Sequence, residues 1–254
     1  MLQPIVVISP FYNCADYIAK CIQSVAAQDY DNYVHILIDD CSTDNTVEVV
    51  KSTVEALPKE IQDRFKIAIN TENQGAVKNQ IDHIRGLMNN NSIIMLLDGD
   101  DSLVNDNTIF SQYNALYDGT TEFTYGSCWS MVDNIPLISQ PYPEHVKQAR
   151  EYRNHHFNWI LPYTHFRTFK KYLINGIDNS MFQDGQGEWY KAGGDGSVFY
   201  ALIEAAKPDN IKCLQDIVYN YNDINPLNDY KVNSDEQTRT ARDIVNKTKT
   251  TKYS

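Results

Sequence analysis

The sequence predicts an α/β fold, with a mostly parallel central sheet flanked by helices and a smaller C-terminal part. Short apolar runs recur through the first half of the chain, and a segment with helical apolar spacing follows each of the first three. Continuous apolar runs are typical of strands buried on both faces, as the strands of parallel sheets are. Strands that alternate with helices in this way favour one sheet with helices on both faces.

Four strands and three helices are predicted in the first half. The strands are residues 5–8, 34–38, 65–69 and 93–97. The helices are marked by apolar residues three or four positions apart, namely Ala15, Ile18, Ile22 and Val25, then Val47, Val50, Val54 and Leu57, then Val77, Ile81, Ile84 and Met88. Ligands of such sheets bind beyond the carboxyl ends of the strands, so one cleft is expected there. The polar loops that open at these ends begin at Ser9, Asp39, Asn70 and Asp98.

The second half is less regular. A strand is expected at residues 123–129, with residues 135–139 pairing beside it, and a helix at 195–206. Two further short strands are expected at 211–214 and 217–221. The polar tail from residue 233 onward is expected to form a loose helix.

Composition and charge exclude several classes of protein. The chain has 254 residues and a formal net charge of −11. An acidic surface repels phosphate backbones and anionic headgroups, so neither nucleic acid nor an anionic membrane is expected as a partner. The five cysteines include no CxxC pair, which favours free thiols in a reducing compartment. No apolar run approaches the roughly 20 residues of a membrane span and no signal peptide is visible, so a cytoplasmic location is expected.

Acidic side chains follow two of the predicted strands. They are Asp39 and Asp40 after one strand and Asp98, Asp100 and Asp101 after another. Carboxylates brought together raise one another's pKa values, and a divalent cation relieves that repulsion. Mg²⁺ and Mn²⁺ prefer oxygen ligands and often keep substrate phosphates in their shell. The alternative is a pair of solvated acidic turns, since aspartate is common in turns and at helix starts. Carboxylates at two separate strand ends of one sheet favour the cation site.

Four short motifs occupy the strand ends and the start of the third helix. They are Pro10-Phe11-Tyr12-Asn13, Asp39-Asp40-Cys41-Ser42-Thr43-Asp44-Asn45-Thr46, Asn73-Gln74-Gly75-Ala76 and Asp98-Gly99-Asp100-Asp101. In order and spacing, over roughly the first 130 residues, they resemble the family 2 glycosyltransferases of GT-A fold. The later half resembles that family only loosely. Cys41 stands where many members carry glycine, which we interpret as a position that accepts a small residue.

The resemblance implies a role for each motif. Pro10, Phe11, Tyr12 and Asn13 would line the base and ribose of a nucleotide, and Asn73 and Gly75 would complete the nucleotide site. Asp39 or Asp40 would accept a hydrogen bond from a ring N–H of the base, commonly uracil. Asp98 would approach the ribose or the sugar and the metal, and Asp100 would bind the Mn²⁺ or Mg²⁺ that bridges the donor phosphates.

The resemblance also implies the reaction and the division of the chain. Residues 1–130 would bind a nucleotide-sugar donor, UDP-sugars being favoured, and residues 131–230 would bind the acceptor and supply the base. Residues 231–254 form a polar tail. Family 2 members are generally inverting, so transfer to an acceptor hydroxyl on a glycan, protein or small molecule is expected in one displacement. The cation would stabilise the diphosphate leaving group.

The catalytic base is expected in the second half, because the acceptor hydroxyl must lose its proton opposite the leaving group. Asp195 is the best candidate, since the family often places an aspartate at the start of such a helix. The alternative is that Asp195 only caps the helix, and both roles can hold together. Glu188 and Asp184 are the other candidates.

Several further residues have two interpretations. The glycine-rich, polar segment 183–189 is typical of a mobile lid, and Asp184, Glu188 and Trp189 within it are candidate acceptor or sugar contacts. Trp189 either stacks on a sugar face or pins the loop to the core. His165 either binds the metal or a phosphate or is a satisfied core histidine, and Arg167 is a candidate phosphate partner.

Three rival functions are less well supported. A nucleotidyltransferase would need a glycine-rich basic loop after the first strand, and the chain has Ser9-Pro10-Phe11-Tyr12-Asn13 there. A non-catalytic nucleotide- or carbohydrate-binding domain is disfavoured by the intact Asp98-Gly99-Asp100. A dinucleotide-binding dehydrogenase would need a GxGxxG motif after the first strand, and none is present.

Overall fold

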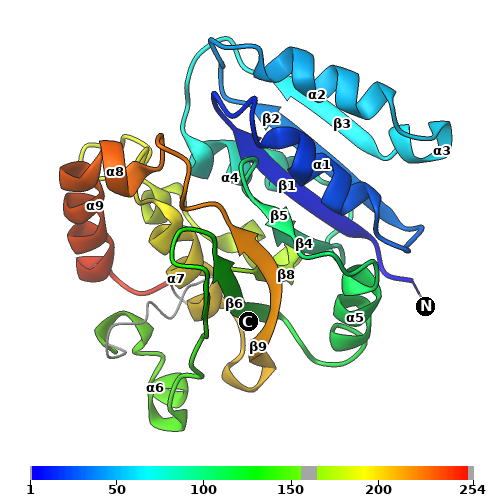
Figure 1. The fold of residues 1–254 in the computed structure, drawn as a ribbon. Helices are drawn as coiled ribbons and strands as arrows, with labels where there is room; N and C mark the ends of the chain where they lie inside the picture. The colour runs from blue at the N-terminus through cyan, green and yellow to red at the C-terminus, as the bar shows by residue number, and fades with distance from the viewer. Residues whose placement is uncertain (1, 156–164, 251–254) are drawn as a thin grey trace.

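The computed structural model describes residues 2–155 and 165–250 (Figure 1). The strands in chain order are β1 (Ile5–Phe11), β2 (Tyr33–Asp39), β3 (Phe65–Ile69), β4 (Ile93–Leu96), β5 (Ser102–Leu103), β6 (Phe123–Ser130), β7 (Ile135–Leu137), β8 (Arg167–Lys170) and β9 (Ile211–Tyr221). The helices are α1 (Ile18–Ala26), α2 (Thr46–Glu55), α3 (Lys59–Gln62), α4 (Ala76–Gly86), α5 (Ile109–Leu116), α6 (Glu144–Ala149), α7 (Asp195–Ala205), α8 (Asp229–Val232) and α9 (Ser234–Asn246). Short 3₁₀ turns are η1 (Tyr152–Asn154), η2 (Lys171–Gly176), η3 (Asn179–Phe182) and η4 (Pro208–Asn210).

One sheet runs through both halves of the described chain, in the order β3-β2-β1-β4-β8-β6-β9-β5, with β7 beside β6. The first four strands are mutually parallel, and β8 is antiparallel to both β4 and β6. Strand β9 then runs parallel to β6. The predicted α/β fold with a mostly parallel central sheet flanked by helices is therefore confirmed.

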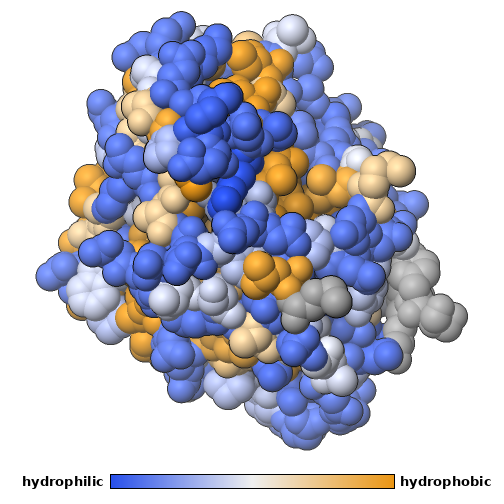
Figure 2. Space-filling view, turned by 90° about the vertical axis from the view of Figure 1, so that its right-hand side faces the viewer, coloured by the Kyte–Doolittle hydropathy of each residue, from blue (hydrophilic) through white to orange (hydrophobic). Residues whose placement is uncertain are grey.

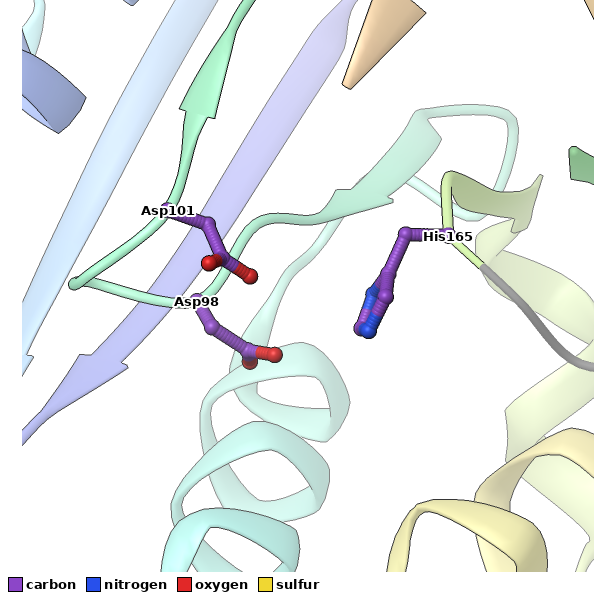
Figure 3. A group of neighbouring side chains, drawn as sticks. All are labelled: Asp98, Asp101 and His165. Atoms are coloured by element: carbon purple, nitrogen blue, oxygen red, sulfur yellow. The ribbon is translucent and has the colours of Figure 1, made fainter. Parts of the chain in front are cut away.

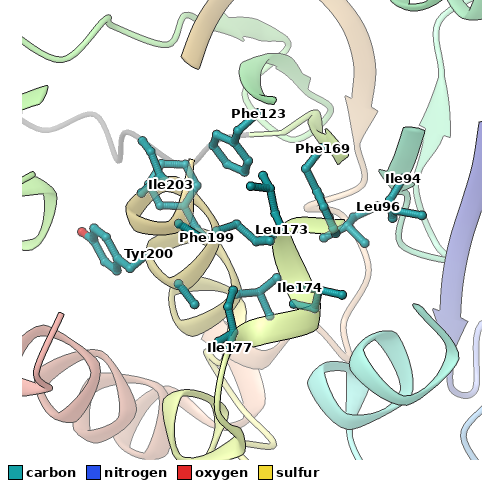
Figure 4. Packing of buried hydrophobic residues seen from close by; sticks show 14 of the residues in the cluster. Ile94, Leu96, Phe123, Phe169, Leu173, Ile174, Ile177, Phe199, Tyr200 and Ile203 are labelled. Carbon is teal, nitrogen blue, oxygen red and sulfur yellow. The ribbon is translucent and has the colours of Figure 1, made fainter. Parts of the chain in front are cut away.

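Alternate residues of the central strands point to opposite faces of the sheet, and each face carries its own hydrophobic cluster. Ile5 and Val7 of β1 belong to the cluster that packs against α1, α2 and α5. Val6 and Ile8 belong to the cluster that packs against α4, α7 and η2. Figure 4 shows part of this second cluster, where Phe199 and Ile203 of α7 meet strand residues such as Phe123.

Two details of the prediction are wrong. The expected strands at 211–214 and 217–221 form one strand, β9, whose pairing with β6 shifts register near Ser127. A bulge of this kind lets one strand continue past an irregularity that the sequence pattern shows as a break. Met88, expected on a helix stripe, is 95% exposed because α4 ends at Gly86.

The surface agrees with the acidic composition. Figure 2 shows the side of the molecule that lies on the right of Figure 1, where hydrophilic residues dominate and apolar residues form separate patches. Among the helices that the structure describes, none has the length and apolar character needed to cross a bilayer.

Candidate active site at the carboxyl edge of the sheet

The topology brings the motif-bearing loops to one edge of the sheet. Phe11 pairs with Asp39 at the ends of β1 and β2, and the loop that begins at Asp98 follows β4. Strand β8 enters from the same edge, because it is antiparallel to β4 and Arg167 pairs with Leu96. Continuing that register places His165 across from Asp98. The expected convergence of the polar loops at one edge is therefore seen.

The carboxylate of Asp40 braces the loop before α4. Its two oxygens accept hydrogen bonds from the backbone N–H groups of Gln74 and Gly75, each at 2.8 Å. The side-chain amide of Asn70 donates to it at 3.1 Å, and Asn73 donates to the Asp40 backbone carbonyl at 3.2 Å. Gly75 has φ +85°, a left-handed conformation that favours glycine. Asp40 therefore holds the backbone of the predicted nucleotide loop in place.

The remaining predicted nucleotide residues are arranged in two ways. Pro10 and Phe11 belong to β1, and Phe11 is buried in the core, whereas Tyr12 is exposed. The side-chain oxygen of Asn13 accepts from the Thr43 backbone N–H at 2.8 Å, so the first two loops are joined. The carboxylate of Asp39 accepts only a bond from Ser42 N–H, at 3.1 Å, among those that the structure shows for the described residues. Of the two candidate aspartates, Asp39 is therefore the less heavily used by the fold.

Cys41 has a left-handed backbone with φ +66°. This conformation is costly for residues with a side chain and easy for glycine, which explains why glycine suits the position. Our interpretation that the position only requires a small residue is therefore incomplete.

Asp98, Asp101 and His165 form a group that fits a divalent cation. One ligand atom from each residue lies within 4.8 Å of the other two, and the side chains point toward one another (Figure 3). Gly99 is required between the aspartates, since a Cβ there would lie 2.4 Å from the Cβ of Phe11. Two carboxylate oxygens and an imidazole nitrogen suit Mn²⁺ or Mg²⁺, carboxylates being the preferred ligands. The predicted ligands Asp98 and His165 are brought together, and Asp101 joins them where Asp100 was expected.

Asp101 is held by residues that the sequence analysis did not single out. The hydroxyl of Tyr219 donates to its carboxylate, and the backbone N–H of Asn222 donates at 2.6 Å. Burial, reinforced by the negative charges of Asp100 and Asp98, raises the pKa of Asp101. A cation in this group would counteract that effect. Asp100 itself accepts a bond from the Asn225 side-chain amide at 2.7 Å.

Like the residues of the predicted loops, two of these partners are polar residues that follow a strand. Asn222 and Asn225 follow β9, whose carboxyl end reaches the same edge of the sheet because β9 runs parallel to β6. Polar residues after a strand were used to find the first-half loops, and the same rule applied here would have found these two.

His165 lies in an aromatic stack. Its ring is nearly parallel to those of Tyr219 and Tyr221, with centroid distances of 4.6 Å and 5.2 Å. Burial, together with the positive charge of Arg167, lowers the pKa of His165 to about 3. The imidazole is therefore neutral at physiological pH, as a metal ligand must be.

Asp195 is the first residue of α7, and Gly194 is the N-cap, without a side-chain capping bond. The alternative that Asp195 serves only as the cap is therefore wrong. Its carboxylate accepts from Arg167 at 3.3 Å, and its side chain is 52% exposed. Desolvation raises the pKa of Asp195, but the positive charge of Arg167 and its hydrogen bond outweigh that effect, and the net pKa lies below the usual range. Asp195 is thus an ionised carboxylate that solvent can reach.

The segment 183–189 forms a small closed turn. Asp184 caps it by accepting from the backbone N–H groups of Gln186 and Glu188, at 2.8 and 3.0 Å. Trp189 stacks on Phe182 with centroids 6.1 Å apart, and the Lys78 ammonium lies 5.8 Å from its ring centroid. These contacts favour the interpretation in which Trp189 pins the loop. Glu188 is exposed.

The family model described as "Glycosyl transferase family 2" matches residues 6–177, well over half of the chain. The chain therefore belongs to the family 2 glycosyltransferases.

Curated relatives match shorter stretches. "Glycosyltransferase GlyG" from Streptococcus pneumoniae serotype 4 is 27% identical over 130 residues, covering 51% of this chain and 40% of that protein. "Putative teichuronic acid biosynthesis glycosyltransferase TuaG" from Bacillus subtilis is 36% identical over 70 residues, covering 28% of this chain and 26% of that protein. Each match spans less than half of the relative.

Solved structures with the same fold are similar over most of the chain. Residues 1–349 of TarS from S. aureus give a TM-score of 0.60 at 18% identity, covering 87% of this chain and 60% of that one. Glucosyl-3-phosphoglycerate synthase from Mycobacterium tuberculosis, solved with Mn²⁺, uridine diphosphate and glucosyl-3-phosphoglycerate, gives 0.57 at 14% identity, covering 96% and 77%. At these identities the similarity is one of fold.

Proposed function

We propose that the chain transfers a sugar from a UDP-sugar to an acceptor hydroxyl, with inversion and with the help of Mn²⁺ or Mg²⁺. The observation that carries this proposal is the convergence at one sheet edge of the Asp98–Asp101–His165 group and the solvent-accessible carboxylate of Asp195. The first is suited to hold a diphosphate through a cation, and the second to accept a proton. Family membership and the UDP-bound structures of TarS and the mycobacterial synthase support the choice of donor.

Residues 1–130 form the donor-binding half in this proposal. Tyr12, Asn13 and Asp39 line the base and ribose, with Asp39 accepting from the uracil N–H. Asp40 contributes indirectly, because it fixes the backbone of the loop that contains Asn73 and Gly75. We assign Asp39 to the base and Asp40 to the loop because the carboxylate of Asp40 already accepts more hydrogen bonds within the fold.

Asp98, Asp101 and His165 would hold the cation, and Asp100 remains a predicted ligand beside them. When bound, the cation acts as a Lewis acid that stabilises the charge on the departing diphosphate. The chain's own carboxylates orient the donor, and the buried position of Asp101 keeps its oxygens turned into the group.

Asp195 acts as the base, from the 131–230 half that binds the acceptor. The acceptor oxygen forms a bond to the anomeric carbon, the bond from that carbon to the diphosphate oxygen breaks, and the hydroxyl proton passes to Asp195. Glu188, Asp184 and Trp189 lie in the neighbouring turn and would shape the acceptor side.

Calorimetric titration of UDP with and without Mn²⁺ tests the donor site. Binding at least tenfold tighter with Mn²⁺ is expected, because the diphosphate and the acidic group repel each other without it. Equal affinity in both conditions would count against the proposal. A panel of UDP- and GDP-sugars, assayed for metal-dependent release of the nucleoside diphosphate, identifies the donor. Release of pyrophosphate from a nucleoside triphosphate would instead indicate a nucleotidyltransferase.

Asp195→Asn tests the base. The variant should bind UDP like the wild type and lose about 10²- to 10⁴-fold in kcat, since it keeps the shape of the carboxylate but cannot accept the proton. Single-turnover assays with the donor found above measure this loss. Transfer at a near wild-type rate would show that another group is the base.

A further inference from the structure

Tyr221 is a half-buried tyrosine beside the Asp98–Asp101–His165 group, which we call the cation group. Its ring lies nearly parallel to that of His165, with a centroid distance of 5.2 Å and an interplanar angle of 24°. Its backbone is fixed on both sides, because it is the last residue of β9 and pairs with β6, and the N–H of the next residue, Asn222, donates to Asp101 at 2.6 Å. The fold therefore holds this ring against one member of the cation group.

The hydroxyl of Tyr221 makes no contact that the fold needs. It forms no hydrogen bond with any residue that the structure describes, and it is not one of the buried polar atoms that lack a partner, so it reaches solvent. Tyr219 lies two positions earlier on the same side of the strand and also stacks on His165, at 4.6 Å, but its hydroxyl donates to Asp101. The hydroxyl of Tyr219 therefore braces a carboxylate, whereas that of Tyr221 is available to a ligand.

The hydroxyl of Tyr221 also lies close to the carboxylates of the site. Burial raises the pKa of Tyr221, and the negative charges of Asp101, Asp195 and Asp98 raise it further. Even an unperturbed tyrosine is protonated at physiological pH, so this hydroxyl is a neutral hydrogen-bond donor. It can therefore contact an anion without adding negative charge to an acidic site.

A diphosphate at this edge of the sheet needs such donors, because its oxygens accept hydrogen bonds. The carboxylates of the site, when ionised, are acceptors too and cannot supply them. Arg167 carries N–H groups, but its side chain is only 4% exposed and its Nη2 already donates to Asp195 at 3.3 Å. Tyr221 is a donor beside the cation group that the fold itself does not use.

We propose that Tyr221 is a catalytic residue whose hydroxyl donates a hydrogen bond to the phosphate that departs from the sugar. This inference rests on the proposed function, since it requires a nucleotide-sugar donor. Negative charge grows on that phosphate as its bond to the anomeric carbon breaks, so a fixed neutral donor stabilises the transition state more than the bound donor. The phenol keeps its proton throughout, and the proton of the acceptor hydroxyl passes to Asp195.

Calorimetric titration of Tyr221→Phe with UDP and with uridine, both with Mn²⁺ present, tests the contact without turnover. UDP affinity should fall about tenfold, because the diphosphate loses one donor to a charged group. Uridine affinity should stay within about twofold of wild type, since uridine has no phosphate for the hydroxyl to contact. Unchanged UDP affinity, or an equal loss of uridine affinity, would overturn the proposal.

Tyr219→Phe is the matched control, because it removes a hydroxyl from the neighbouring ring of the same stack. Its Tm should fall by about 2–4 °C, since the buried carboxylate of Asp101 loses a donor. Tyr221→Phe keeps the ring on His165 and breaks no hydrogen bond of the fold, so its Tm should stay within about 1 °C of wild type. An equal fall in Tm for both variants would show that the hydroxyl of Tyr221 serves the fold, and would overturn its proposed role.

Kinetics of Tyr221→Phe distinguish departure of the diphosphate from placement of the acceptor. Transfer to an acceptor and hydrolysis of the donor without acceptor should both slow by about 10- to 100-fold, because both break the same bond. Slower transfer with unchanged hydrolysis would place Tyr221 on the acceptor and overturn the proposal. A wild type that neither binds UDP nor cleaves any nucleotide sugar would overturn the proposed function itself. A wild type that does both, with an unaltered Tyr221→Phe, would overturn only the role of Tyr221.

Discussion

The carboxylate of Asp40 accepts two backbone N–H groups and one side-chain amide, from residues 30 to 35 positions further along the chain. Asp39, its neighbour, accepts from a single local N–H group. Adjacent aspartates therefore differ in role at the residue scale. Nothing in the local sequence distinguishes them, because the partners of Asp40 become neighbours only when β2 and β3 pair.

We expect Asp40→Asn to lower the free energy of unfolding by about 2–3 kcal/mol, since the amide cannot accept at both positions and leaves a buried N–H unsatisfied. Asp39→Asn should cost about 1 kcal/mol and weaken UDP binding more than it weakens the fold. Urea unfolding and UDP titration of both variants measure these effects. Equal losses of stability would show that the two carboxylates share the same structural role.

At the scale of elements, α9 packs closely against the segment that leads into α7. Gly193 has φ +67°, and a Cβ built there would lie 2.6 Å from Cγ and 3.1 Å from Cα of Gln237. The hydroxyl of Tyr190 also donates to Asp243 of α9. The expected loose tail helix is therefore a fixed part of the fold, and it supports the start of the helix that bears Asp195.

Alanine substitutions at three glycines distinguish the effect of a left-handed backbone from the effect of a close neighbouring residue. Gly193 combines positive φ with a close neighbour, Gly187 has φ +85° with nothing within 4 Å, and Gly185 has neither restriction. Gly187→Ala should cost about 1–2 kcal/mol from the left-handed backbone alone. Gly193→Ala should cost more because α9 must also move, and Gly185→Ala should be nearly neutral. Thermal unfolding of the three variants checks this order, and a neutral Gly193→Ala would mean that α9 does not press on this segment.

The parallel strands could be predicted from the sequence and β8 could not, and the reason is physical. The four parallel strands are buried on both faces, so each appears as an apolar run. Strand β8 is equally buried, yet it reads Arg-Thr-Phe-Lys. Its polar groups find partners far along the chain: Thr168 with Tyr117 and Thr124, at 2.9 and 2.6 Å, and Arg167 with Asp195. Such pairing is invisible to a local pattern. The carboxylates of the site could be predicted from their strand ends, but the antiparallel strand that brings His165 to them could not.

At the scale of the whole molecule, one sheet includes strands from both halves of the described chain, and the C-terminal segment is attached to the second half. Arg153 and Glu204 form a buried ion pair in which both side chains are at most 5% exposed. The backbone N–H of Thr250 donates to the same carboxylate at 2.8 Å, and Arg153 also donates to the carbonyl of Ile244 in α9. This pair connects η1, α7, α9 and the residues beyond α9.

Glu204→Gln should lower the free energy of unfolding by about 3–5 kcal/mol, because it leaves the Arg153 charge buried without its counter-ion. Asp63→Asn is the control: it removes the Lys59–Asp63 pair, whose side chains are 76% and 69% exposed. That change should leave the free energy of unfolding unchanged within the error of the measurement, since solvent screens exposed pairs. Urea unfolding of both variants measures the difference. The double variant Arg153→Met/Glu204→Leu should recover much of the lost stability, because it leaves no unpaired charge in the interior. If Glu204→Gln is as stable as the control, solvent reaches the pair, and the attachment of α9 to α7 must then depend on apolar contacts such as those of Ile244.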